Sequence, residues 1–94
     1  MYTAEQIFIN RLLDLINEDV CYNRVLASAM EDIGLFDDYR KAVEILIFEV
    51  RDVKHEVVNI IQATYFDVDY FNEASTRLTY LSEILQVAKV NGGF

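Results

Sequence analysis

The sequence predicts an all-α fold: a bundle of four helices, two short ones followed by a long antiparallel helical hairpin. The 94 residues contain no proline, and two of the three glycines lie among the last three residues, so little in the chain would interrupt a helix. Hydrophobic residues make up 53% of the chain and recur at spacings of three and four, which is the pattern of buried helix faces. We therefore expect one helical domain over residues 1–94.

The first helix is expected over residues 4–17. Thr3-Ala4-Glu5-Gln6 has the spacing of a capping box, in which the Thr and Gln side chains bond the free backbone groups of the first turn. Apolar residues then form a stripe at helical spacing: Phe8, Ile9, Leu12, Leu13, Leu15 and Ile16.

The second helix is expected over residues 20–33, with Asp19 as its N-cap. Gly34 followed by the apolar Leu35 is typical of a helix C-terminus at which glycine adopts a positive φ.

The third and fourth helices are expected over residues 38–65 and 69–90, with residues 91–94 as a frayed tail. Asp37 or Asp38 would open the third helix. Its apolar residues alternate spacings of four and three, as in coiled coils: Tyr39, Val43, Leu46, Val50, Val53, Val57 and Ile60. At roughly 42 Å, this helix would be longer than the ~32 Å diameter of a compact chain of this size. The helix must therefore bend, or the molecule is elongated and part of the hairpin stays uncovered.

A second apolar stripe is expected on the last helix, formed by Tyr80, Ile84 and Val87, while Ile45 and Phe48 leave the main stripe of the third helix. Solvated helix faces seldom carry such residues in a row. Two alternatives account for them: the first two helices cover them within the same chain, or they form the interface of a homodimer or higher homo-oligomer.

The segment between the two long helices is a candidate contact surface. Residues 65–71 hold four aromatic residues and two aspartates. Tyrosine anchors many protein interfaces, so Tyr65 and Tyr70, with Asp67 and Asp69, are predicted partner-binding residues. The two phenylalanines of the segment are expected to close the end of the bundle.

The charge disfavours some partners and suits others. Sixteen acidic and eight basic residues give a formal charge of −8, which repels nucleic acid and anionic membranes and suits a basic protein. Glu31, Asp32, Asp37 and Asp38 gather around the expected turn between the second and third helices and are the other predicted partner-binding residues. The alternative is that the charge only keeps a small domain soluble. With one cysteine, no secretion signal and no apolar run of about 20 residues, we expect a cytoplasmic protein.

Catalytic chemistry has little support. Asp52 and His55 have the spacing of half a di-iron site, but the chain has no second histidine. Arg51 and His55 are one residue closer than the Arg–His pair of small helical ribonucleases, and the net charge is wrong for binding RNA. Cys21 has no histidine nearby in sequence to activate it. We expect no enzyme activity, no metal and no cofactor.

The leading hypothesis is a small acidic module that binds a basic protein and inhibits or regulates it by steric blocking. Bacterial immunity proteins and phage-encoded inhibitors of host defence share this profile of size and charge. The alternative is a homo-oligomeric helical scaffold or assembly protein. A weaker alternative is an oligomer that binds a small ligand at its interface, which would require Arg11, Arg24, Arg40 and Lys41 to converge if that ligand were anionic.

Overall fold

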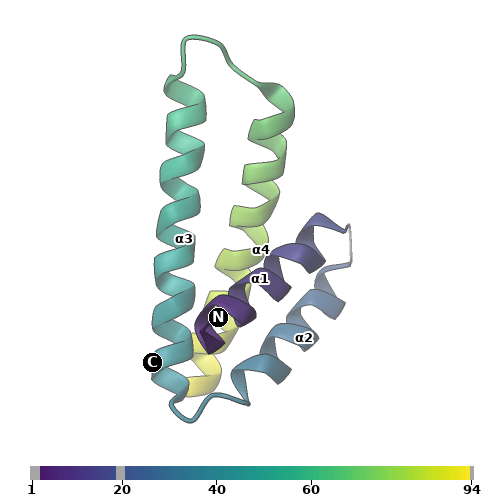
Figure 1. Ribbon diagram of the computed structural model, residues 1–94, viewed down its shortest axis with the longest axis vertical. Helices are drawn as coiled ribbons and strands as arrows, with labels where there is room; N and C mark the ends of the chain where they lie inside the picture. Colours follow the sequence, from purple (N-terminus) through teal and green to yellow (C-terminus); the bar gives the residue numbers. More distant parts are fainter. Residues whose placement is uncertain (1–2, 19–20, 94) are drawn as a thin grey trace.

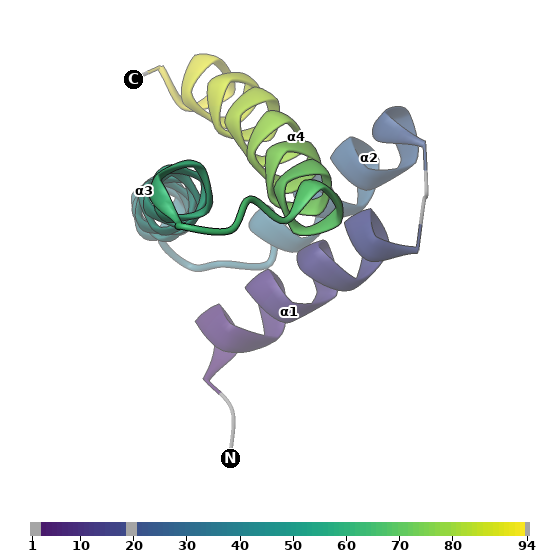
Figure 2. The same cartoon turned by 90° about the horizontal axis from the view of Figure 1, so that it is seen from above.

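The computed structural model describes residues 3–18 and 21–93 and has four helices in these ranges. They are α1 (Ala4–Asn17), α2 (Tyr22–Ile33), α3 (Tyr39–Gln62) and α4 (Val68–Gly92). α3 and α4 form a long antiparallel hairpin, and the shorter α1 and α2 pack against one side of it (Figures 1 and 2). The predicted all-α, bundle-like fold is confirmed.

Three helices begin at residues whose side chains bond the first turn. The Thr3 hydroxyl accepts the Gln6 N–H (3.2 Å), and the Gln6 side chain accepts the Thr3 N–H (3.3 Å), which completes the capping box. Asp38 accepts the Arg40 N–H (3.0 Å) at the start of α3. Asp67 accepts the Tyr70 N–H (3.1 Å) at the start of α4. Two acidic side chains therefore have a structural role at helix N-termini, where a negative charge is favourable.

α2 begins differently from what the sequence suggested. Its N-cap is Cys21, whose side chain makes no capping hydrogen bond. Asp19, the expected cap, and Val20, the expected first residue of the helix, lie outside the described residues.

The helix ends differ from expectation at three places. α3 stops at Gln62, because Ala63 is already extended (ψ 148°). α4 continues through residues 91 and 92 of the expected frayed tail and stops at Gly93, which adopts a positive φ of 76°; Phe94 lies outside the described residues. The predicted positive φ at Gly34 is wrong, since its φ is −63°. There the chain continues in right-handed turns, in which the N–H groups of residues 35 and 36 bond the carbonyls of residues 32 and 33 (both 3.1 Å).

The core lies between the hairpin and the two N-terminal helices. The α3 stripe is its centre: five of the predicted residues are buried and two are half-buried. Side chains from the other three helices complete it, among them Phe8, Leu12, Ile16, Val25, Ala29, Ile33, Leu81, Ile84 and Ala88. The Tyr39 hydroxyl donates to the Ala88 carbonyl (2.7 Å), which joins the start of α3 to the end of α4.

The molecule is elongated, which was one of the two outcomes that the length of the third helix allowed. Its extents are 44 × 31 × 23 Å, and its radius of gyration is 13.8 Å, against the ~12 Å expected of a compact chain of this size. The connection between α3 and α4 lies at one end of the long axis, beyond α1 and α2 (Figure 1). The connection between α2 and α3 lies at the opposite end. The hairpin therefore extends beyond α1 and α2 at one end of the molecule and is joined to α2 at the other (Figure 1).

Candidate functional site

The end of the hairpin carries a cluster of exposed apolar and aromatic side chains. We call this surface the hairpin end; its members are Val58, Ile61, Tyr65, Phe66, Val68 and Tyr70. At this end α3 and α4 extend beyond α1 and α2, so these side chains have no N-terminal helix to pack against (Figure 1). Phe66 stacks on Phe71 (ring centroids 5.2 Å apart), as expected of residues that close the bundle, although Phe66 remains 44% exposed. The result is an apolar surface that nothing in the described chain covers.

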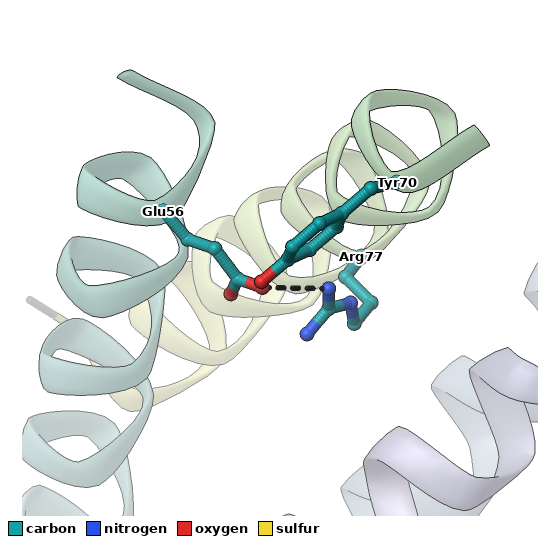
Figure 3. Close-up of polar contacts among 3 residues, drawn as sticks. All are labelled: Glu56, Tyr70 and Arg77. Atoms are coloured by element: carbon teal, nitrogen blue, oxygen red, sulfur yellow. Dashed lines mark hydrogen bonds and ion pairs between the residues drawn. The ribbon is translucent and has the colours of Figure 1, made fainter. Parts of the chain in front are cut away.

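A polar network crosses the hairpin just below this surface (Figure 3). Glu56 of α3 accepts a hydrogen bond from the Tyr70 hydroxyl of α4, and the same carboxylate oxygen lies 3.1 Å from Nη2 of Arg77. The Arg77 and Glu56 side chains are only 19% and 29% exposed, so the ion pair is partly shielded from water. Glu56 thus holds two side chains of α4 in place.

The network shifts the pKa values of two of its members in opposite directions. The hydrogen bond from Tyr70, followed in effect by that from Arg77, holds the pKa of Glu56 below its usual value although partial burial opposes this. The same hydrogen bond to Glu56 raises the pKa of Tyr70. The interacting pair is therefore ionised glutamate and neutral tyrosine at neutral pH, with the tyrosine as the donor.

Three of the predicted partner-binding residues come together at this end. Tyr65, Asp67 and Tyr70 line a shallow groove of about 290 Å³ between the last turn of α3 and the first turn of α4. Tyr65 is the most exposed of them, at 83%. Asp67 also caps α4 and therefore has a structural role. Asp69 is an exposed residue of the first α4 turn and has no such role.

The four acidic residues predicted at the other end divide in the same way. Asp32 forms an ion pair with Arg11 (3.4 Å), and Asp38 caps α3. Glu31 and Asp37 are exposed. Asp32, Asp37 and Asp38 line one cavity, which we call the base cavity; its walls come from α1, the end of α2, the α2–α3 connection and the start of α3. Two of the four basic residues whose convergence was in question, Arg11 and Lys41, also line it.

The second apolar stripe of the last helix is largely covered within the chain. Ile84 is fully buried (0% exposed) in the core, and Tyr80 packs edge-on against Tyr22 of α2 (centroids 5.6 Å apart). Val87 is half-buried. The first alternative, cover by the N-terminal helices, therefore describes this stripe. Ile84 has no exposed surface that a second copy of the chain could contact.

Ile45 and Phe48 lie elsewhere. Ile45 is half-buried against the core, whereas Phe48 is exposed, with the Arg51 guanidinium 5.6 Å from its ring centre. These two residues line a shallow depression with α1. Of the residues predicted to form an oligomer interface, Phe48 is the exposed one.

The residues considered for chemistry lie apart. Cys21 is exposed, and His55 and Asp52 lie on the solvated face of α3. Over residues 3–18 and 21–93, no three His, Cys, Asp or Glu side chains are grouped so that they could hold a metal ion. Within the same ranges, no helix combines the length and the apolar character needed to cross a membrane.

Comparison of the chain with protein-family models, with curated proteins and with solved structures found no match.

Sequence reasoning missed two groups of surface residues. The exposure of Ile61 and Val68 follows from their position beyond the reach of α1 and α2, which no local pattern indicates. Leu35, which follows the right-handed Gly34, is 79% exposed, and the sequence did not indicate this exposure. Only the length of the third helix signalled that part of the hairpin would be uncovered.

Proposed function

We propose that this chain is a small acidic module that binds another protein through the hairpin end and thereby blocks or regulates that protein, in the cytoplasm. The observation that carries the proposal is the cluster of exposed apolar and aromatic side chains at one end of the bundle. Contiguous exposed apolar surface is unfavourable in water, and in monomeric proteins its larger patches mark contact sites.

The build of the hairpin end favours tight contact. Tyr65 and Tyr70 offer large contact areas with few rotatable bonds, and the hydrogen bond to Glu56 holds Tyr70 before any partner arrives. A side chain that is already ordered loses less conformational entropy on binding. The hairpin connection at residues 63–67 projects beyond α1 and α2, which suits a steric mode of inhibition (Figure 1).

The net charge of −8 favours a basic partner. Long-range attraction accelerates the encounter and is weakened by salt, whereas the apolar contacts of the hairpin end determine how long the complex lasts. Two aspartates, Asp38 and Asp67, are occupied as helix caps, so exposed acids such as Asp69 are the candidates for direct contact.

The test is affinity capture from the native host, or its infected cells, with the wild-type chain and three variants. Ile61→Ser and Val68→Ser each remove an exposed apolar side chain of the hairpin end and leave the core intact. Val90→Ser is the matched control, since Val90 is equally apolar and exposed but lies near the other end of α4. We expect one recurrent basic protein to be captured by the wild type and the control, and to be depleted with both hairpin-end variants. Equal capture by all four chains would contradict a role for this surface.

The scaffold alternative rests on Phe48, the exposed residue of the predicted oligomer interface. Sedimentation of the isolated chain tests it: a dimer that Phe48→Ser dissociates would support it, and a monomer at all concentrations would remove it.

A further inference from the structure

The base cavity is a second hollow surface, at the end of the molecule opposite the hairpin end. Its volume is about 480 Å³, within the range of pockets that bind ligands larger than a single side chain. Phe8 and Phe36 pack edge-to-face (centroids 5.6 Å apart) and form part of its wall. Because Phe8 belongs to the core, this part of the wall is fixed by the packing of the bundle.

Two apolar side chains of this cavity remain open to solvent. Ile7 on α1 is 50% exposed, and Leu35 in the α2–α3 connection is 79% exposed. A ligand that covered both would bury apolar surface that folding leaves in water, which is favourable in proportion to the area removed.

The polar side chains of the cavity are unbalanced in charge. Four carboxylates, Glu5, Asp32, Asp37 and Asp38, line it with two cations. One cation, Arg11, pairs with Asp32 (3.4 Å), and the other, Lys41, forms no ion pair among residues 3–18 and 21–93. Within residues 3–18 and 21–93, Asp37 and Asp38 form no ion pair. The lining of the cavity therefore carries two more carboxylates than cations.

We propose that the base cavity docks a short segment of a protein in which aliphatic or aromatic side chains stand next to lysine or arginine. The apolar side chains lie against Ile7, Leu35 and Phe36, and the cation lies beside Asp37, which is not a helix cap. An acidic segment is rejected, because it would add negative charge to a lining in which carboxylates already outnumber cations. The site is independent of the hairpin end, so the chain would have one contact surface at each end of its long axis.

The test is a titration of the 15N-labelled full chain, followed by the backbone amide resonances in two-dimensional NMR spectra. The probe is the capped peptide acetyl-Lys-Leu-Phe-Lys-amide, and the matched control peptide carries glutamate in place of both lysines. We expect the basic peptide to shift the resonances of residues 7, 35 and 36, and the acidic peptide to leave them in place.

Three variants complete the experiment. Leu35→Ser should weaken peptide binding roughly fivefold, because most of the area it would bury is lost and its exposure makes the fold insensitive to the change. Asp37→Asn should weaken binding and reduce its dependence on salt. Ile61→Ser, at the hairpin end, should bind the peptide as the wild type does.

Three outcomes would overturn the proposal: no shifts around the cavity at millimolar peptide, equal binding of both peptides, or shifts confined to the hairpin end. None of these outcomes bears on capture of a protein through the hairpin end. Conversely, loss of that capture would leave peptide binding at the cavity intact, so the two proposals fail separately.

Discussion

Ile84 lies in the core of the isolated chain, although the sequence also allowed it to lie in an oligomer interface. Truncation of this side chain gives the sharpest test of the fold. The side chain is 0% exposed in the isolated chain. Ile84→Ala removes three carbon atoms, which at about 0.8 kcal/mol each gives a transfer loss of about 2.4 kcal/mol. The cavity left behind adds to this, so we expect the free energy of unfolding to fall by about 3–4 kcal/mol. Ile84→Val, which removes one carbon, should cost about 1 kcal/mol and keeps the test readable if the alanine variant does not fold.

The assay is urea unfolding followed by circular dichroism, at two protein concentrations that differ tenfold. Val90→Ala is the control, because Val90 is 66% exposed and should cost less than about 0.5 kcal/mol. For a monomeric core the unfolding midpoint is the same at both concentrations, whereas a residue buried by self-association makes the midpoint rise with concentration. A concentration-dependent midpoint that Ile84→Ala abolishes, or an Ile84→Ala loss no larger than that of the control, would refute the assignment of Ile84 to the core.

Four further substitutions, one of them a control, test individual interactions by urea unfolding. The hydrogen bond from the Tyr70 hydroxyl lowers the pKa of Glu56, so the stabilisation that ionised Glu56 provides is present above the usual value of 4.5 and is lost as the pH falls through the lowered pKa. Glu56→Gln should therefore flatten the loss of stability in acid. An unchanged pH profile would count against the network. Burial, followed by the nearby negative charge of Asp52, raises the pKa of Glu49, so its ionised form opposes folding at neutral pH. Glu49→Gln should raise the urea midpoint at pH 7 and have no effect at pH 3, where the carboxyl is protonated; a gain at both pH values would point to another cause. Asp38→Ala should cost about 0.5–2 kcal/mol through loss of the α3 cap, whereas Asp37→Ala should cost less than about 0.5 kcal/mol, and equal costs would contradict the capping role.

Periodic features of the sequence were predicted well because they depend on neighbours within one helix. The α3 stripe from Val43 to Ile60 is set by the helical repeat, and the capping box at Thr3 involves residues three positions apart. Both patterns are local, so the sequence contains all the information that determines them.

Features that depend on the relative placement of helices were predicted less well. A periodic stripe cannot indicate which other helix will cover it, and this is why Ile84 could be assigned either to the core or to an interface. Likewise, the exposure of Leu35 depends on the right-handed conformation of Gly34, which the usual preference of glycine at helix ends argued against. The base cavity combines side chains from three helices and a connection, and no stretch of the sequence contains it.

The α3 helix sets the distance between the two proposed contact surfaces. Asp38 stands at its start beside the base cavity, and Tyr65 follows just after its end. Its 24 residues span ~36 Å. A flexible segment that engaged both surfaces at once would need at least about ten extended residues between its two contact motifs. A partner with that spacing would gain avidity from the second contact, whereas two partners of ordinary size could occupy the two ends together without touching.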